Sequence, residues 1–485
     1  MRILAVVEGL LPIITLVGAL MLTVPLVDAI YGENISTWFA VIGASCILAG
    51  YVPYKVLERL GKLVEMGFFE SLLAYSLAWL VVPAISALAL SMELPITYDN
   101  ALFECISGFT GTGLTVLRGL DTVKRGLLFW RGLMQWTGEL GVVVFTAVFL
   151  PFFWRFGFIL YSLERPVRIA ASLRETAAKV LYIYSLVTVI GIVVCIHLGV
   201  EPFDAVVHVM TAIATGGMSN YDANYEAVFE YASMSIYPIT ALMVLGGFNF
   251  AVLSLLLDGE FRRALSNEEF KAYLYLVFAF LVVSLVVALP YYGWSLRDSS
   301  LYGVFNAISA LTTTGFSVGR VGLAESPLKM VYVVAMYIGS MSFSTAGGIK
   351  VVRLLVAYRK LGAYVVSSLT GGAVQVDVKL GETVLDEREV ANALLYLVVH
   401  YFAILIGASV LKAVIPQVDM IDAVFEVTSA ASNVGLSTGI CGPEMPLVAK
   451  ATLMCLMYIG RLEYLPLVAL AGVLLYRKYR VFIVR

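Results

Sequence analysis

About ten stretches of some twenty apolar residues follow one another along this sequence, and no other feature restricts its folding as strongly. A helix needs about 20 such residues to cross the hydrocarbon core of a bilayer. The stretches predict spans at 3–30, 36–55, 68–92, 127–152, 176–199, 233–257, 271–293, 328–358, 391–414 and 447–476. Because 60% of the residues are hydrophobic and only 14% are charged, we predict an all-α integral membrane protein.

Basic residues are unevenly distributed between the loops that join these spans. The loop 153–175 holds four arginines, whereas the segment 200–232 has five carboxylates and no lysine or arginine. Loops rich in lysine and arginine stay on the cytoplasmic side of a membrane. The bias therefore predicts a multi-pass protein of the cell (inner or plasma) membrane with both termini in the cytoplasm.

Residues typical of metal sites and catalytic sites are dispersed. The five cysteines and three histidines form no CxxC pair and no cluster, which argues against a disulfide framework or a resident metal. The sequence also has no HExxH motif and no histidine near a candidate serine nucleophile, so an enzyme is not expected. The net charge of −2 gives no indication of nucleic acid binding.

One twelve-residue unit occurs four times, each time between two apolar stretches. Aligned without gaps, the copies read ECISGFTGTGLT from Glu104, HVMTAIATGGMS from His208, NAISALTTTGFS from Asn306 and EVTSAASNVGLS from Glu426. The fourth and twelfth residues are always Ser or Thr, and the tenth is always glycine. Such repeats indicate one structural unit used several times. We predict four tandem helix–pore loop–helix repeats around a central ion pore, after two extra N-terminal transmembrane helices.

This pattern divides the chain into six parts. The predicted parts are 1–62 with two transmembrane helices, 63–155 as repeat one, 156–262 as repeat two, 263–358 as repeat three, 359–390 as a cytoplasmic linker and 391–485 as repeat four with the tail. The span 328–358 contains the small and polar stretch GSMSFSTAGGIK (339–350). In the linker, AVQVDVKLGETVLD alternates apolar and polar residues, which predicts a small hairpin.

The chemistry of the repeated unit suits a cation. Its first eight residues are too short to span a bilayer, and irregular backbone at membrane depth occurs only when it is buried in protein or lines water. Rings of backbone carbonyls replace the hydration shell of potassium in known filters, and glycine allows the necessary backbone turns. The predicted ion-binding residues are Thr112, Gly113, Gly216, Gly217, Thr314, Gly315, Val434 and Gly435.

At these residues the chain resembles the Trk/Ktr/HKT superfamily of potassium uptake proteins. SGFTGTGLTV is similar to the first filter of that superfamily, and FWRGLMQWTGELGVVVFTAVFLP (129–151) to the helix after it, with Glu139 at a position expected to be glycine. GGFNF (246–250), STAGGIK (344–350) and GRLE (460–463) also match. The two extra N-terminal helices resemble the TrkH branch, whereas VGLSTGI (434–440) is more similar to KtrB.

The resemblance implies one pore per chain, a homodimer in membrane lipid, and a cytoplasmic TrkA/KtrA-type subunit that binds ATP or NAD and gates the pore. Potassium would be the transported ion, with no cofactor in this chain. Four filter glycines imply a preference for potassium, because a serine at the first position accompanies sodium preference in plant relatives. The implied gate residues are Gly339, Ser344, Thr345, Gly347, Gly348 and Arg461.

Several interpretations remain open at this point. Arg461 is either a gate charge or part of a structural salt bridge, and Glu139 either stabilises the ion path or pairs with an arginine. For Glu104 and Glu426, structural hydrogen bonds behind the filter are favoured over a role as ion ligands. Potassium could also move by symport with sodium or protons, or the chain could be the potassium-binding subunit of an ATP-driven pump.

Overall fold

The computed structural model describes residues 3–61, 63, 68–156, 173–371, 373, 376–381 and 383–464. Helices dominate this part of the chain, and the only strands in it are the two-residue β1 (Lys379–Leu380) and β2 (Thr383–Val384). Six of its helices are long and apolar enough to cross a membrane, and a seventh span results if one bent pair is counted. The predicted span 447–476 lies only partly within the described residues, which end at Tyr464.

The helices before repeat three are α1 (Ile3–Met21), α2 (Thr23–Ile30), α3 (Thr37–Arg59), α4 (Phe68–Glu93), α5 (Tyr98–Phe109), η1 (Leu120–Thr122), α6 (Arg125–Phe156), α8 (Leu173–His197), α9 (Pro202–Ile213), α10 (Glu226–Tyr231), η2 (Ser233–Ser235), α11 (Ile236–Gly246), α12 (Phe250–Leu257) and α13 (Phe261–Ser266). Those that follow are α14 (Glu268–Ala288), α15 (Leu296–Asp298), the π-helical η3 (Ser299–Phe305), α16 (Asn306–Leu311), η4 (Val321–Leu323), α17 (Ser326–Ile338), α18 (Val351–Leu369), α19 (Glu387–Val414), α20 (Met420–Ala431) and α21 (Leu447–Arg461).

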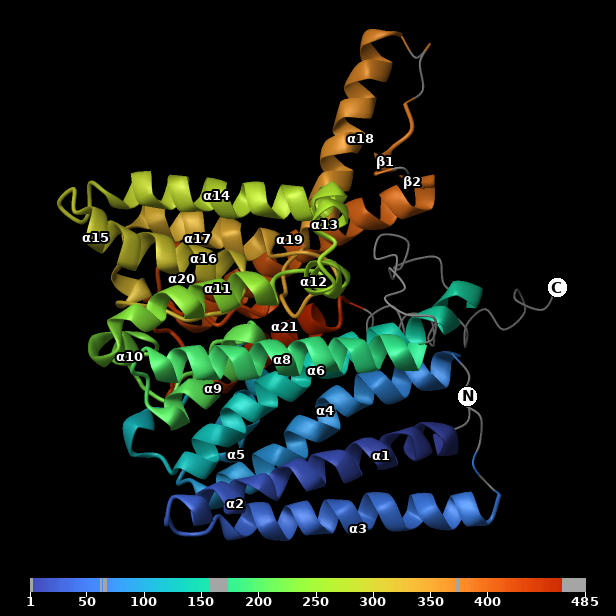
Figure 1. Ribbon diagram of the computed structural model, residues 1–485, viewed down its shortest axis with the longest axis vertical. Helices are drawn as coiled ribbons and strands as arrows, with labels where there is room; N and C mark the ends of the chain where they lie inside the picture. The colour runs from blue at the N-terminus through green and yellow to red at the C-terminus, as the bar shows by residue number, and fades with distance from the viewer. Residues whose placement is uncertain are drawn as a thin grey trace.

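The two N-terminal helices pack closely through glycine. Figure 1 shows α1 and α3 side by side at one edge of the molecule. A Cβ on Gly18 would lie 2.6 Å from the backbone oxygen of Gly43, and a Cβ on Gly43 would lie 2.9 Å from that of Gly18. Small residues allow helix backbones to approach in this way inside a membrane.

The segment 233–257 is not the single helix that its apolar composition predicts. The chain bends by 117° between the helical segment Ser233–Gly246 and α12. The bend has a local cause, because the side-chain oxygen of Asn249 accepts a hydrogen bond of 2.8 Å from the amide of Ala251 and so caps a new helix. The prediction of one continuous span here is wrong.

The segment 328–358 is also interrupted. Helix α17 ends at Ile338 and α18 begins at Val351, and residues 339–350 between them, here called the intramembrane loop, are not helical. Gly339 and Gly348 have φ angles of 69° and 76° and pack against each other. Left-handed backbone of this kind favours glycine and ends the helix.

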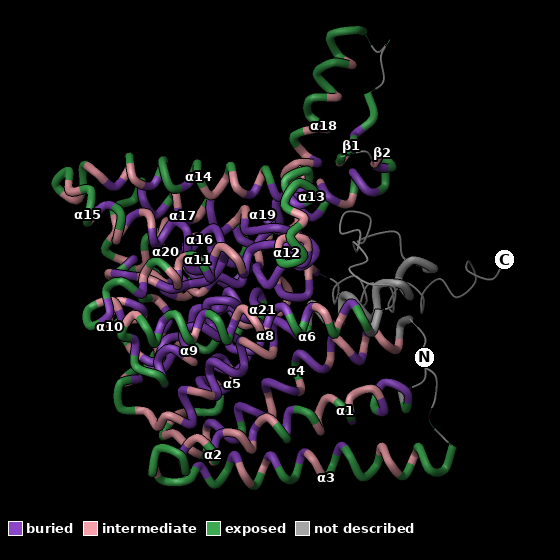
Figure 2. The backbone as a smooth tube through the Cα atoms, in the orientation of Figure 1, coloured by how far each residue is buried: buried purple, intermediate pink, exposed green. Residues whose placement is uncertain are grey.

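The predicted linker is more helical than its sequence suggests. Helix α18 continues to Leu369, and β1 pairs with β2 in the predicted antiparallel hairpin. Helix α19 begins at Glu387 rather than at 391, because Asp386 and Glu389 form a capping box. The end of α18 stands away from the other helices in Figure 1, and Figure 2 colours most of its residues there as exposed.

Four short helices lie in the buried interior shown in Figure 2. They are α5, α9, α16 and α20, and each holds the first half of one repeated unit. Almost every residue of these units up to the conserved glycine is buried. The fold therefore brings four segments that are distant in sequence to one central place.

Candidate ion path

The four conserved glycines meet around one axis. A Cβ on each glycine would overlap the carbonyl oxygen of the ninth residue in the next unit, and the fourth unit closes on the first. The contacts, written as glycine and carbonyl, are Gly113 with Gly216, Gly217 with Thr314, Gly315 with Val434 and Gly435 with Thr112. We call the four glycines Gly113, Gly217, Gly315 and Gly435 the glycine ring. Their contacts bring together all eight residues that the sequence predicts as ion ligands.

The backbone at the ring has a repeated and unusual conformation. In each ring segment (111–113, 215–217, 313–315 and 433–435) the eighth and tenth residues of the unit have positive φ angles, and the ninth does not. The eighth residue is glycine only in unit one. In the other units it is Thr215, Thr313 or Asn433, and these residues have positive φ angles of 49°, 54° and 52°. In a regular strand, successive side chains and carbonyls point to opposite sides. A left-handed residue at every second position interrupts that alternation. Conformations of this kind persist only where the surroundings impose them.

One hydrogen bond recurs in all four units and sets this turn. The amide of the ninth residue donates to the carbonyl of the fourth residue, which is the conserved Ser or Thr. The four N–O distances are 2.9 Å for Thr112 to Ser107, 2.9 Å for Gly216 to Thr211, 2.8 Å for Thr314 to Ser309 and 2.9 Å for Val434 to Ser429. The four ring segments therefore leave their short helices in the same way.

The first residue of each unit stabilises the chain behind the ring. A Glu104 oxygen accepts a hydrogen bond of 2.9 Å from the Thr115 hydroxyl, and a Glu426 oxygen accepts one of 2.6 Å from the Ser437 hydroxyl. At the same position His208 lies 2.9 Å from the Ser219 hydroxyl, and Asn306 accepts 3.0 Å from the amide of Val318. The structural hydrogen bonds predicted for the two glutamates are present.

Two polar residues on α6 contact the ring region and are not singled out by the sequence analysis. Arg131 forms an ion pair of 2.8 Å with Glu104 and donates to the carbonyl of Ser219. Gln135, one helical turn later, bonds to the second ring segment. Their spacing of four residues on one helix face inside an apolar stretch is the signal that could have identified them.

The intramembrane loop lies against one end of the ring segments. The amide of Gly347 donates to the Thr313 hydroxyl at 2.7 Å, and the hydroxyls of Thr345 and Thr215 are 3.1 Å apart. The amide of Gly348 donates to the carbonyl of Ser432 at 3.1 Å. The loop thus contacts three of the four units.

The other predicted gate residues shape or anchor this loop. The Ser344 hydroxyl donates to the carbonyl of Met341 at 2.6 Å, within the loop. The Thr345 hydroxyl lies 2.9 Å from the carbonyl of Gly246, next to the bend after α11. Gly339 and Gly348 form the close contact at the two ends of the loop.

Arg461 and Glu139 form a buried ion pair beside the loop. A guanidinium nitrogen of Arg461 also donates to the carbonyl of Thr345 at 3.3 Å. A Cβ on Gly111 would overlap a Glu139 carboxylate oxygen, so this carboxylate lies directly against the first ring segment. Glu139 therefore pairs with an arginine, one of the two interpretations left open by the sequence, and Arg461 is part of a salt bridge that contacts the loop.

A second ion pair joins α18 to the chain after α21. Arg353 pairs with Glu463, and its guanidinium lies 4.0 Å from the centre of the Tyr396 ring on α19. Only 2% of Arg353 is exposed. The helix that follows the intramembrane loop is therefore fixed to the last repeat by charge and by ring contact.

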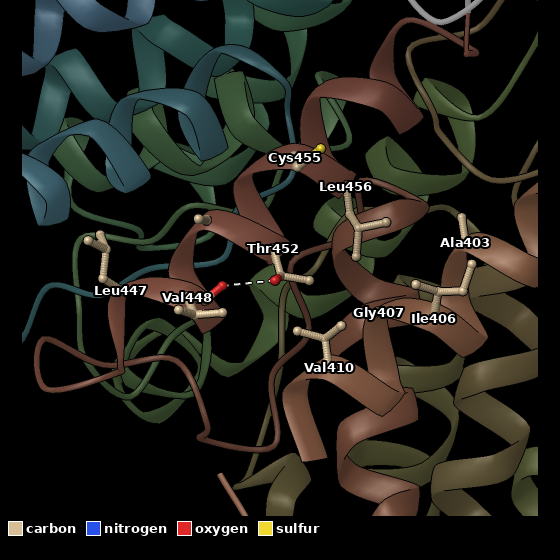
Figure 3. Close-up of a pocket in the computed structure, with 10 residues that line it drawn as sticks. Ala403, Ile406, Gly407, Val410, Leu447, Val448, Thr452, Cys455 and Leu456 are labelled. Atoms are coloured by element: carbon tan, nitrogen blue, oxygen red, sulfur yellow. Dashed lines mark hydrogen bonds between the residues drawn. The ribbon is translucent and has the colours of Figure 1, made fainter. Parts of the chain in front are cut away.

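A separate apolar groove of about 620 Å³ lies between α19 and α21. Figure 3 shows its side chains, which include Ile406, Val410 and Leu456. The Thr452 hydroxyl donates to the carbonyl of Val448 at 2.8 Å on its own helix. Because that hydroxyl is already bonded, the groove suits hydrocarbon rather than an ion. Within the described residues no cluster of His, Cys, Asp or Glu could hold a metal ion.

Comparison with known proteins agrees with this architecture. A solved structure, the potassium transporter TrkH from Vibrio parahaemolyticus, superposes with a TM-score of 0.85 over 97% of this chain and 98% of that chain, at 24% sequence identity. This match and the apolar helices confirm the predicted fold class, an all-α integral membrane protein that crosses the membrane several times.

Sequence comparison identifies the family. The chain is 30% identical to the Trk system potassium uptake protein TrkH of Escherichia coli, over 84% of this chain and 86% of that protein. It is 28% identical to an uncharacterized cation transporter of Methanocaldococcus jannaschii, over 98% and 97% of the two chains. The family model for TrkH, a cation transport protein, matches residues 45–297 and 294–478. The predicted resemblance is confirmed, and the chain belongs to the TrkH family of cation transport proteins, which is not a family of enzymes.

Proposed function

We propose that this protein carries out potassium uptake across the cell membrane, and that the glycine ring is its selectivity filter. The observation that carries the proposal is the closed contact of four glycines with four neighbouring carbonyls. The names of relatives, among them a potassium uptake protein that is 30% identical, support potassium as the ion.

Selectivity in this proposal comes from backbone oxygens. Thr112, Gly216, Thr314 and Val434 supply one ring of carbonyls, which replace water around a dehydrated cation. The short helices α5, α9, α16 and α20 end next to the ring segments, so the partial negative charge of their C-terminal ends favours a cation there. No side-chain carboxylate is needed as a ligand.

Gating in this proposal is a movement of the intramembrane loop. Its hydrogen bonds to Thr313, Thr215 and Ser432 hold it against the ring segments. Arg461, whose charge is paired with Glu139, holds the carbonyl of Thr345 at the same level. An open path requires that these contacts break together, so the loop would act as a single two-state element.

The proposed regulator is a cytoplasmic TrkA/KtrA-type subunit that binds ATP or NAD, and the proposed assembly is a homodimer in membrane lipid with both termini in the cytoplasm. The relative from Escherichia coli is named for a Trk system, which supports a partner. Helix α18 begins where the intramembrane loop ends, and its far end stands away from the other helices. A partner that contacts α18 would be connected to the loop by one helix.

The test is Gly113→Ser, because even the Cβ of the new side chain would overlap the carbonyl oxygen of Gly216. We expect the ratio of potassium to sodium flux to fall in liposomes and in cells that lack their own potassium uptake systems. Gly439→Ser is the matched control, because Gly439 also has a positive φ, of 95°, but a Cβ there would meet no atom of the described residues within 4 Å apart from its chain neighbours. If Gly113→Ser protein is present in the membrane and its selectivity is unchanged, the filter assignment is wrong. Discrete single-channel currents would exclude coupled symport.

A further inference from the structure

The second ring segment has an unusual ninth residue. The ninth residue is Thr112, Thr314 and Val434 in units one, three and four, all β-branched and therefore stiff. In unit two it is Gly216, which is followed directly by Gly217. Two consecutive glycines have more backbone freedom than any other pair, so this segment needs stabilisation from elsewhere.

Hydroxyl pairs stabilise two of the other segments. The hydroxyls of Thr110 and Thr112 are 2.8 Å apart, and so are those of Thr312 and Thr314. In unit two the corresponding residues are Ala214 and Gly216, which have no hydroxyl. The second segment cannot form this bond.

The space beside Gly216 is occupied by Gln135 of α6. A Cβ on Gly216 would overlap the Gln135 side-chain amide, and Gln135 is completely buried. Its Nε2 donates to the carbonyl of Gly216 at 2.6 Å, and its Oε1 accepts from the amide of Met218 at 3.0 Å. The two bonds flank Gly217 and use both ends of the amide.

We infer that Gln135 is the positioning residue that replaces the missing side chain of Gly216 and fixes the direction of that carbonyl toward the ion. This inference rests on the proposed function of the glycine ring as a filter. A carbonyl oxygen has two lone pairs, so the oxygen of Gly216 can accept from Gln135 and also face a cation. Without Gln135 the Gly216–Gly217 backbone would be free to close around the smaller sodium ion.

The first experiment uses Gln135→Met, which keeps an unbranched side chain of similar length and removes both hydrogen bonds. We expect the ratio of potassium to sodium flux to fall roughly tenfold, the size expected for one or two lost hydrogen bonds. We also expect potassium to raise the melting temperature of the purified protein less than in the wild type. The control is Thr137→Val on the same helix, because the Thr137 hydroxyl donates only to carbonyls of α6, at 2.7 and 3.4 Å. Unchanged selectivity in Gln135→Met overturns the inference.

The second experiment is a rescue. Gly216 does not have the positive φ of its neighbour Gly217, and the three atoms nearest to a Cβ at Gly216 all belong to Gln135, so shortening Gln135 frees space for a side chain there. A threonine at position 216 would have no hydroxyl partner, because the seventh residue of unit two is Ala214. Valine is therefore the matched replacement, and it is the residue at the same position in unit four, Val434. We expect Gln135→Ala and Gly216→Val each to lose selectivity, and the double variant to regain most of it. Simple addition of the two single defects would overturn the inference.

These outcomes separate the two proposals. If Gly113→Ser changes selectivity and Gln135→Met does not, the filter assignment stands and the role of Gln135 is wrong. If neither variant changes selectivity, the filter assignment itself fails.

Discussion

The ion pair of Glu139 and Arg461 places two charges beside the first ring segment. A charge at membrane depth is costly alone, and removing one partner of a buried pair leaves the other uncompensated. The two residues are 322 positions apart, so each is visible in the sequence as an unusual charge, whereas their contact is not. The carboxylate of Glu139 lies against Gly111, where it offsets the positive charge of Arg461 near the path.

Glu139→Gln should therefore slow potassium transport. The variant keeps the size of the side chain but leaves Arg461 as a net positive charge beside the first ring segment, which repels a cation. We expect potassium flux in liposomes to fall by about tenfold, since a cost of about 1.4 kcal/mol has that effect.

The double variant Glu139→Gln with Arg461→Gln removes both charges of the pair. We expect it to restore much of the potassium flux that Glu139→Gln loses. Glu58→Gln is the control, because Glu58 pairs with Lys55 on exposed surface. Wild-type flux in Glu139→Gln would show that the pair has no electrostatic effect on the path.

At the scale of elements, the intramembrane loop and the bend after α11 belong together. Thr345 of the loop bonds to the carbonyl of Gly246 where α11 ends, and the amide of Phe250 at the start of α12 donates to the carbonyl of Phe343 at 3.1 Å. Both interruptions fall in apolar stretches that hydropathy interprets as continuous spans. The loop thus bonds the end of α11 and the start of α12, so backbone groups freed by the bend find partners inside the protein, as irregular backbone in a membrane requires.

Thr313→Val should loosen the loop. Valine has the same shape as threonine, but it cannot accept the hydrogen bond from the amide of Gly347. We expect more potassium leak through the protein without its regulator, measured as basal flux in liposomes. Thr428→Val is the control, because the Thr428 hydroxyl donates to the carbonyl of Val424 on its own helix at 2.7 Å. Equal basal flux in the two variants would argue against the loop as the gate.

At the scale of the whole molecule, ion pairs connect successive repeats near the starts of the short helices. Lys329 of α17 pairs with Asp422 of α20, and Lys450 of α21 pairs with Asp99 of α5, each at 2.7 Å. Both lysines are buried and both aspartates lie in the first turn of a short helix. The outer helix of one repeat is therefore linked to the short helix of the next.

Lys450→Met should lower the stability of the whole protein. It removes the partner of Asp99 and a hydrogen bond of 2.9 Å to the carbonyl of Pro443, which we expect to cost about 1–3 kcal/mol. The measurement is the melting temperature of the protein in detergent. Lys55→Met, at an exposed pair, should leave the melting temperature nearly unchanged, and a similar shift in both variants would contradict the role of the link.

Much of the architecture could be predicted because it depends on local pattern. Apolar length indicates spans, and four units in register indicate a shared structure around the residues that form the glycine ring. The 117° bend at 246–250 could not be predicted from hydropathy, because both of its arms are apolar. Gln135 was missed for another reason: its importance comes from the absence of a side chain at Gly216, in a non-helical segment that is distant in sequence.

The closure of the glycine ring also restricts the order of assembly. The last contact joins Gly435 to Thr112, and the side chain of Asn433 donates to the Thr112 hydroxyl across 321 positions. During synthesis the first three repeats are made before any residue of the fourth exists. Until then, the first and third ring segments have one unpaired side each, inside the membrane. The closed ring, and with it the proposed filter, can therefore form only after α20 has been made.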